Sequence, residues 1–239
     1  MHLKFMTWPE VDSYLAKRKD IIIPIGATEQ HGPMGLIGTD HLCAEGIAAG
    51  VAEECESIVA PTVTYGMSLH HLGFSGTVAV RPQTFAAVIE DCVNSLAQHG
   101  FERILFVNGH GGNEPATLSA FSDLYRTLDI RCEFVNWWIF PPVAALAEKL
   151  FGEKEGHHAT PGELSVSFFL HPEHQKKAEL KEGIGMDHRI YSAKDFRKRY
   201  PDGRMISDSS LASVEAGKQL YETAVAEISN FHRKFIAED

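Results

Sequence analysis

Short apolar runs alternate along the chain with longer segments whose apolar positions recur at helical spacing. The apolar runs cover residues 21–25, 57–64, 78–80, 103–107 and 131–138, and this pattern predicts strands. Helical spacing or capping signals mark residues 7–15, 39–55, 82–99, a segment beginning at 114, and residues from about 211 to 237. Residues 172–201 are rich in Lys and His and look loop-like. The alternation predicts an α/β fold of three layers (αβα), in which helices cover both faces of a mostly parallel sheet, as one domain over residues 1–239.

The isoleucine-rich run at residues 21–25 leads into a glycine-rich loop that carries Glu29, His31 and Asp40. Side chains alternate along extended chain, so Glu29 and His31 project to one side while Gln30 points away. Gly and Pro residues allow the loop to fold back and bring Asp40 to the same place. Converging carboxylate and imidazole groups indicate a metal site. The alternative for Asp40 is a plain helix N-cap, since it stands where the next helix begins.

A second glycine-rich loop, residues 108–113 (NGHGGN), follows the strand predicted at 103–107. Open parallel sheets bind their ligands at the carboxyl ends of the strands, which is where this loop belongs. His110 is therefore a candidate metal ligand. Two alternatives are a turn that merely needs positive φ and a phosphate-binding loop, although the loop has neither a GxGxxG pattern nor a Walker lysine.

Two further stretches are candidates to line the same cleft. His71 lies in a long loop, residues 65–77, where it could bind substrate or metal or be an ordinary surface histidine. Trp137 and Trp138 end a predicted strand, so alternation sends one into the core and allows the other to face the cleft, unless both are core residues.

A polar, turn-rich stretch carries His157, His158 and Glu163 and leads into the apolar residues 168–170. Its carboxylate and histidines should therefore stand at the mouth of a buried helix. Every stretch with chemically useful side chains, from Glu29 onward, thus falls just after a predicted strand or before a buried helix, which favours one shared cleft.

Composition excludes several classes of partner. The chain of 239 residues has 32 Asp and Glu against 22 Lys and Arg, a formal charge of -10. A nucleic-acid or anionic-membrane surface would need a concentrated basic face, so we expect neither partner. The N-terminus has no long apolar segment before a cleavage site, which favours the cytoplasm. The 4 cysteines form no CxxC pair and are expected to be reduced thiols.

These motifs resemble the creatininase (creatinine amidohydrolase) family. The resemblance rests on residues 25–33 (IGATEQHGP), 38–40 (GTD) and 108–113 (NGHGGN), with weaker similarity at 76–77 and 216–218. It implies an α/β fold, a homohexamer, and hydrolysis of amide or cyclic amide bonds of a small molecule with one or two divalent metal ions. Zn is the first expectation for the ion, with Mn or Fe as alternatives.

The resemblance also implies that Glu29, His31, Asp40 and His110 are metal ligands, with Asp40 bridging two ions. The chain departs from the family in two motifs. Creatininase has a Glu two residues after the motif histidine, where this chain has Gly112. Many members carry HAGExETS, whereas residues 158–167 read HATPGELSVS. Glu163 is then the candidate for completing the second ion's ligands, and Glu114 is the fallback. These departures argue against creatinine itself as the substrate.

A metal-activated water near neutral pH would then attack the substrate. His158, His157 and Glu163 are the candidate catalytic residues for carrying protons and stabilising the oxyanion. Trp137, Trp138, His71 and Asn108 are the candidate substrate-binding residues. One alternative is hydrolysis of a C–C or C–O bond in a cyclic keto-polyol or lactone. Another is a non-catalytic module that keeps the metal for structure or ligand binding.

Overall fold

Within residues 1–181 and 189–238, which the computed structural model describes, four parallel strands form one sheet. The strands are β1 (Asp20–Ile25), β2 (Ile58–Val59), β3 (Arg103–Asn108) and β4 (Arg131–Asn136), in the order β2-β1-β3-β4. Ile25 pairs with Asn108, and Asn108 pairs with Asn136. Three strands therefore end at the same level, and the loops that follow them leave from one edge of the sheet.

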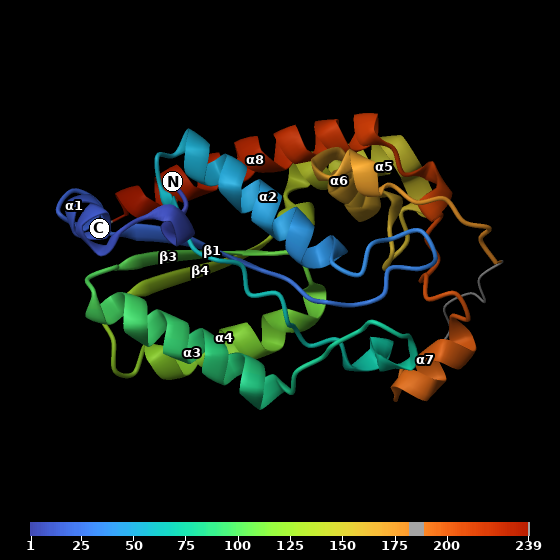
Figure 1. The fold of residues 1–239 in the computed structure, drawn as a ribbon, viewed down its shortest axis with the longest axis horizontal. Coiled ribbons are helices and arrows are strands. Elements are labelled where there is room, and N and C mark those ends of the chain that lie inside the picture. Colours follow the sequence, from blue (N-terminus) through green and yellow to red (C-terminus); the bar gives the residue numbers. More distant parts are fainter. Residues whose placement is uncertain (182–188, 239) are drawn as a thin grey trace.

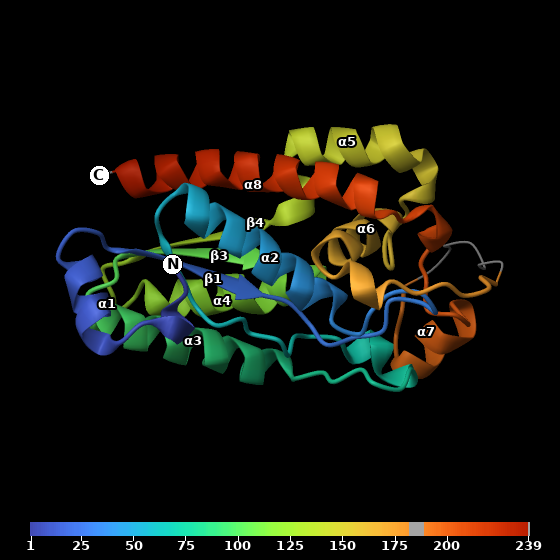
Figure 2. The same ribbon diagram turned by 45° about the horizontal axis from the view of Figure 1, so that its top comes forward.

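Helices cover both faces of the sheet (Figures 1 and 2). One face carries α2 (Thr39–Glu54), α5 (Pro141–Phe151), α6 (Pro161–Leu170) and the long α8 (Val214–Ala237). The other face carries α3 (Pro82–Gln98) and α4 (Glu114–Leu124), and α1 (Trp8–Leu15) packs at the end of the sheet where the strands begin. The expected three-layer arrangement is confirmed, with a sheet that is wholly parallel.

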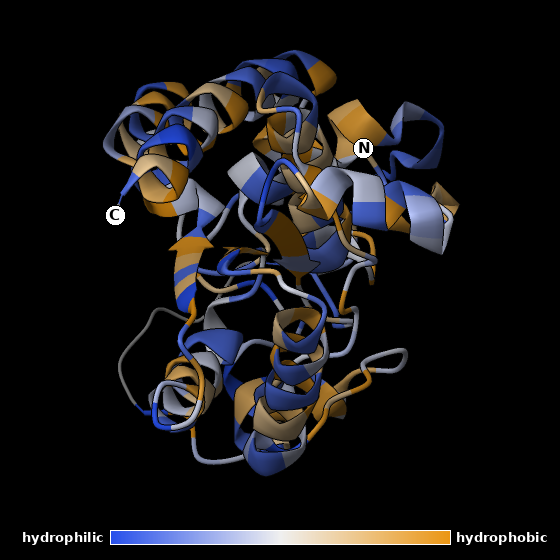
Figure 3. Ribbon diagram, turned by 90° about the vertical axis from the view of Figure 1, so that its left-hand side faces the viewer, coloured by the Kyte–Doolittle hydropathy of each residue, from blue (hydrophilic) through white to orange (hydrophobic). Residues whose placement is uncertain are grey.

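The isoleucine run of β1 is continuous because both sides of the strand are buried. Ile22 joins the cluster under α2 and α8, whereas Ile21, Ile23 and Ile25 join the cluster under α3 and α4. Figure 3 shows the apolar strands between the two helical layers. Two cores of this kind hold the sheet rigid, which fixes the loops at its carboxyl edge.

Three predicted strands are shorter than the sequence pattern indicates. The run at 57–64 pairs regularly only over Ile58–Val59, since Pro61 has no amide hydrogen for a ladder, and Val63 returns to β1 as a single bridge. The run at 78–80 makes one antiparallel bridge, between Val78 and Thr28. The predicted strand at 131–138 ends at Asn136, because the two tryptophans turn into a short 3-10 helix.

Two helices were not expected. Helix α5 opens with Pro141 and Pro142 at its first two positions, where the missing amide hydrogens cost nothing. Helix α7 (Ala193–Arg199) lies in the stretch expected to be loop-like and buries Phe196, while residues 182–188 of that stretch lie outside the described residues. All 4 cysteines are free thiols, as expected. No helix among the described residues has the length and apolar character to cross a membrane.

Candidate metal centre

Five candidate ligands converge at the carboxyl edge of the sheet from four parts of the chain. Glu29 and His31 come from the loop after β1, and His110 comes from the loop after β3. Asp40 lies in the first turn of α2 and Glu163 in the first turn of α6. Since the loops after β1 and β3 leave adjacent strands at the same level, their side chains meet over the ends of those strands.

The ligand atoms form overlapping groups that are each small enough to hold one ion. Among the described residues, one group is Glu29, Asp40 and His110, and a second is His31, Asp40 and Glu163. In the first, His110 Nδ1 lies 3.4 Å from Glu29 Oε1 and 3.2 Å from Asp40 Oδ2. In the second, His31 Nε2 lies 2.9 Å from Asp40 Oδ1 and 3.8 Å from Glu163 Oε2. Asp40 is common to both.

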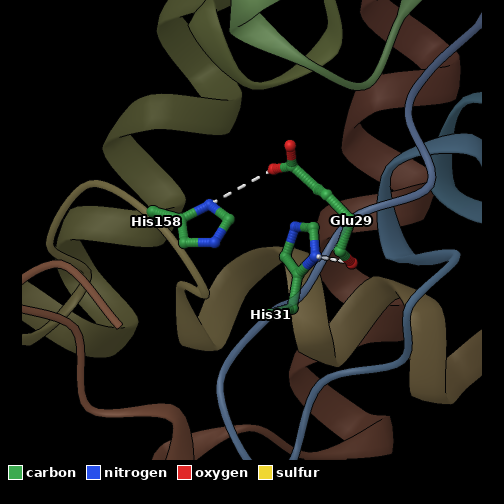
Figure 4. A group of neighbouring side chains, drawn as sticks. All are labelled: Glu29, His31 and His158. Carbon is green, nitrogen blue, oxygen red and sulfur yellow. Dashed lines mark hydrogen bonds and ion pairs between the residues drawn. The ribbon is translucent and has the colours of Figure 1, made fainter. Parts of the chain in front are cut away.

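A third group consists of Glu29, His31 and His158 (Figure 4). His158 Nδ1 lies 3.6 Å from Glu29 Oε1. His31 Nδ1 lies 3.2 Å from the backbone oxygen of Glu29. When Nδ1 of His31 donates to that carbonyl, Nε2 is left with its lone pair toward Asp40, which is the arrangement that a metal-binding imidazole needs.

The buried donors fit a divalent cation. In the described part of the chain, both carboxylate oxygens of Glu29, Nε2 of His31 and Oδ2 of Asp40 are buried without a hydrogen-bond partner. Buried carboxylates left in this state are costly unless a cation compensates them. Carboxylate and imidazole donors together suit Zn, Mn or Fe. The residues present therefore fit the ions that the family resemblance implies.

Close backbone contacts bring Asp40 to the site. A Cβ at Gly109 would lie 2.0 Å from the Asp40 carbonyl oxygen, and one at Gly26 would lie 2.5 Å from the His41 backbone. Only glycine at these two strand ends allows the first turn of α2 to rest directly on β1 and β3. Gly38 is the N-cap of α2, so Asp40 does not cap the helix by itself and its side chain is directed to the two histidines.

The cluster binds protons strongly in the absence of a metal. Burial would lower the pKa of His31, but the neighbouring Asp40 and Glu163 carboxylates raise it to about 10. Burial likewise opposes protonation of His110, and Glu29 and Asp40 nevertheless raise its pKa well above the ordinary value. Burial raises the pKa of Glu163 to about 7, against the opposing effect of His31. Protons and a metal ion therefore compete for the same nitrogen atoms.

A cavity of about 470 Å³ opens beside the ligand cluster. Glu29, Asp40, His110 and Glu163 line its floor, and Trp137, Trp138, His71, His157 and His158 are among the residues of its walls. Trp137 is 3% exposed and also belongs to the core, whereas Trp138 is half-buried. Both tryptophans thus contact the cavity, although they leave the sheet in a 3-10 turn and do not alternate along a strand.

Asn108 and Glu114 lie outside the cavity wall and the ligand groups. The amide nitrogen of fully buried Asn108 donates to the carbonyl oxygen of His110 at 2.7 Å and to Asn136 at 2.6 Å. Glu114 accepts a hydrogen bond from Asn136 at 2.8 Å. Both residues support the loop that carries His110, and Glu163, not Glu114, belongs to a candidate ligand group.

Two residues with a part in the site were not among the sequence candidates. Gln30 is 4% exposed, and its side-chain nitrogen lies 2.8 Å from His71 Nδ1 and 2.9 Å from His158 Nε2. Glu155 lines the cavity and accepts a hydrogen bond from the backbone nitrogen of Gly162 at 3.1 Å. The sequence carries no signal for this part of Gln30, because its contacts come from residues far along the chain.

Known proteins resemble the chain in sequence. Residues 4–232 match the family model Creatininase, described as creatinine amidohydrolase. A mycofactocin precursor peptide peptidase of Mycolicibacterium smegmatis is 39% identical over 106 residues, which are 42% of this chain and 42% of the peptidase. The 3-dehydro-scyllo-inosose hydrolase of Thermotoga maritima is 28% identical over 92% of this chain and 78% of that protein. Creatinine amidohydrolase of Pseudomonas putida is 24% identical over 96% of this chain and 95% of that protein.

Solved structures share the fold. A crystal structure of creatinine amidohydrolase (creatininase) superposes with a TM-score of 0.90 at 22% identity, covering 100% of this chain and 98% of that one. A manganese form of creatininase has a TM-score of 0.88 at 23% identity over 99% of both chains, and a Zn–Zn form of a creatininase variant has the same score and identity. Since the family match spans nearly the whole sequence and the fold agrees, the chain belongs to the creatininase family of metal-dependent hydrolases.

Proposed function

We propose that the chain hydrolyses an amide or cyclic amide C–N bond of a small molecule with two divalent metal ions. The observation that carries this proposal is the pair of ligand groups that share Asp40 at the floor of a cavity. One ion would be held by Glu29, Asp40 and His110, and the other by His31, Asp40 and Glu163. A structural metal site is closed by its protein ligands, whereas a cavity of about 470 Å³ leaves room for a substrate.

The bound ions would supply a water of lowered pKa and a Lewis acid for the carbonyl oxygen. His158 would move a proton from the attacking water to the leaving nitrogen, because its Nδ1 faces the ligand cluster. His157 and Glu163, which also line the cavity, are further proton carriers. Trp137, Trp138 and His71 would hold the substrate, and Asn108 would act through the loop that carries His110.

Zn is our first choice for the native ion, with Mn or Fe as alternatives, because zinc and manganese forms exist among the solved creatininases. We also propose a homohexamer, as the family resemblance implies, which light scattering after gel filtration would test. The location in the cytoplasm and a single domain over residues 1–239 stay predictions of the sequence.

A second candidate is hydrolysis of a cyclic keto-polyol. It is favoured by the Thermotoga maritima relative, whose match covers 92% of this chain. The same ligand cluster would serve a ketone, since in both reactions a nucleophilic oxygen attacks a polarised carbonyl carbon. The bond that breaks would then be C–C or C–O.

The test is a product assay with zinc-loaded or manganese-loaded protein. The panel contains cyclic amides including creatinine, short peptides, and a cyclic keto-polyol, with products identified by mass spectrometry. We expect turnover of at least one amide, lost by about 1,000-fold or more in His31→Ala, because the ion held by this ligand is required. The control is His174→Ala, which removes an exposed histidine from the same protein.

Turnover that survives in His31→Ala would contradict the metal-dependent mechanism. Turnover confined to the keto-polyol would favour the second candidate. Protein that keeps its ions and turns over none of these substrates would favour a non-catalytic module that uses the metal for structure or ligand binding.

A further inference from the structure

Gln30 has a side-chain amide whose orientation is fixed by two independent contacts. Its Oε1 accepts a hydrogen bond from the backbone nitrogen of Gly32 at 2.9 Å. Its Nε2 donates to the backbone oxygen of Gly203 at 3.0 Å. Exchanging oxygen and nitrogen would put a donor against the Gly32 amide and an acceptor against the Gly203 carbonyl, so only one orientation satisfies both.

The fixed amide determines which nitrogen of His71 carries the proton. Nε2 of Gln30 lies 2.8 Å from His71 Nδ1 and has one hydrogen left after its bond to Gly203. His158 Nε2 lies 2.9 Å from the same nitrogen but donates to the backbone oxygen of Gln30, so it cannot accept that hydrogen. His71 Nδ1 therefore accepts it, which excludes the tautomer protonated at Nδ1. The proton of His71 is therefore on Nε2, the atom that lies 3.7 Å from Glu29 Oε1 at the ligand cluster.

Gln30 also determines the tautomer of His158, which is likewise protonated at Nε2 but turns its other nitrogen toward the ligand cluster. Both amide hydrogens of Gln30 are already used, so the 2.9 Å approach of His158 Nε2 to that nitrogen is not a hydrogen bond from the amide. His158 Nε2 also lies 2.9 Å from the backbone oxygen of Gln30, to which it must donate. The lone pair of His158 is left on Nδ1, which faces Glu29 Oε1 at 3.6 Å (Figure 4).

We propose that Gln30 is a positioning residue that holds two neighbouring histidines in the same tautomer, protonated at Nε2, but with opposite ring atoms toward the reacting centre, so that His71 presents an N–H and His158 presents a lone pair there. His71 Nε2 and His158 Nδ1 lie 3.7 Å and 3.6 Å from the same atom, Oε1 of Glu29, so both nitrogens face one point of the ligand cluster. Burial supports the assignment, since Gln30, His71 and His158 are 4%, 7% and 8% exposed and water cannot readily replace these contacts.

The catalytic meaning of this arrangement rests on the proposed hydrolase function. His158 Nδ1 accepts one proton as the water oxygen bonds to the carbonyl carbon, and returns that proton to the nitrogen when the C–N bond breaks. His71 keeps its proton and donates a hydrogen bond to the carbonyl oxygen as negative charge develops there. If His71 carried its proton on Nδ1 instead, two lone pairs would face the substrate and none would stabilise that oxygen.

The tautomers of His71 and His158 can be measured directly without a substrate. Zinc-loaded protein labelled with ¹⁵N in histidine is measured by long-range ¹H–¹⁵N correlation, which separates protonated from unprotonated ring nitrogens. The signals are assigned by their loss in His71→Asn and His158→Asn. We expect the proton on Nε2 in both rings. A proton on Nδ1 of His71, or a lone pair on Nε2 of His158, would overturn the proposal whatever the substrate proves to be.

Gln30→Glu tests whether Gln30 sets the tautomers. Glu is isosteric but has no amide hydrogens, so His71 should move its proton to Nδ1 and donate to the new carboxylate. With a substrate from the assay above, we expect kcat to fall about 100-fold while KM changes little, because a hydrogen bond made in the transition state is lost. The matched control is Gln219→Glu, the same substitution on the exposed face of α8, which should keep both tautomers and kcat.

A fall in kcat without a change of tautomer in Gln30→Glu would identify a merely structural role and overturn the proposal. If the variant does not fold, the ¹⁵N spectrum of the unmodified protein still shows whether His71 and His158 have the proposed tautomers. Correct tautomers in protein that hydrolyses no amide would contradict the proposed function and leave the assignment of Gln30 intact.

Discussion

Asp40 contributes one carboxylate oxygen to each of the two ligand groups, and no other residue is common to both. Of these two groups, Glu29 belongs only to the one with His110, and Glu163 belongs only to the one with His31. Removing the Asp40 carboxylate should therefore affect the binding of both ions, whereas removing Glu29 or Glu163 should affect the binding of one ion. The described ligand set can therefore be tested one ion at a time.

Asp40→Asn should reduce tightly bound metal from near two ions per chain to near zero, and Glu163→Gln should leave near one. The first substitution weakens both groups, and the second removes a charged ligand from the group of His31 alone. Elemental analysis after gel filtration without chelator measures both. Glu173→Gln, at an exposed carboxylate, is the control. Two ions retained in Glu163→Gln would show that Glu163 is not a ligand.

Gly112→Ala should lower the affinity of the protein for the ion held by His110. A Cβ at this position would lie 2.5 Å from His110 Nε2 and 2.9 Å from the Met67 carbonyl oxygen, so the imidazole must move. We expect a loss of about 10-fold to 100-fold in affinity for one ion, as for other changes that disturb a ligand's orientation. Gly111→Ala is a close control, because its Cβ would meet only Trp138 at 3.8 Å. Equal affinities in the two variants, measured by calorimetry, would contradict the steric argument.

At the scale of the elements, a buried polar network joins the start of β1 to α8 at the edge of the sheet opposite the metal centre. Asp20 Oδ2 accepts hydrogen bonds from Ser57 at 2.6 Å and from His232 at 3.0 Å, and Oδ1 accepts one from Arg18 at 2.8 Å. Burial opposes ionisation of Asp20, but the bonds from His232, Arg18 and Ser57 outweigh it and lower its pKa. The network therefore fixes the C-terminal half of α8 on the sheet.

Asp20→Asn should lower the free energy of unfolding by about 3 kcal/mol at pH 7, because it breaks a buried ionic network by removing one partner. A carboxylate whose pKa is lower in the folded chain stabilises it above the unfolded pKa of about 3.9, and this contribution is lost as pH falls through the folded pKa. The difference between variant and unmodified protein should therefore shrink below pH 4. Urea unfolding at pH 7 and below pH 4 measures this difference in the free energy of unfolding, with exposed Asp123→Asn as control. A difference independent of pH would contradict the electrostatic explanation.

The elements that the sequence predicted well are those with a strong local pattern. The isoleucine run of β1 and the helix from Pro82 follow from apolar periodicity alone, and the strand at 57–64 was overestimated because Pro61 breaks the ladder within an apolar run. Glu29 and His110 were candidates because they follow strands. The part played by Gln30 could not be predicted, since its hydrogen-bond partners His71, His158 and Gly203 lie 41, 128 and 173 positions away.

At the scale of the whole molecule, the metal centre joins segments that are far apart in the chain. The loops after β1 and β3 and the first turns of α2 and α6 all contribute ligands. Helix α6 packs against both α2 and α8, so the ligand cluster lies where the largest helical layer meets the sheet edge. Ions bound there would stabilise the folded chain and have no comparable site in the unfolded chain.

Removing the ions should therefore lower the melting temperature, and the size of the effect should depend on pH. An ion at 100 times its Kd stabilises by about 2.7 kcal/mol, which corresponds to about 8 °C for a chain of this length. The two ions must displace protons from His31, whose pKa is about 10 in the metal-free protein, and from His110, whose pKa is raised well above its ordinary value. Metal affinity thus falls as pH falls.

Scanning calorimetry of zinc-loaded and chelator-treated protein at pH 8, 7 and 6 tests this dependence. We expect the gap in melting temperature to be widest at pH 8 and to narrow toward pH 6, because protons compete more effectively for the imidazole nitrogens at lower pH. Adding zinc back should restore the higher value at each pH. A gap that stays constant over this range would mean that the ions do not bind through protonated histidines, and an absent gap would mean that the cluster of buried carboxylates and imidazoles is stable without a cation.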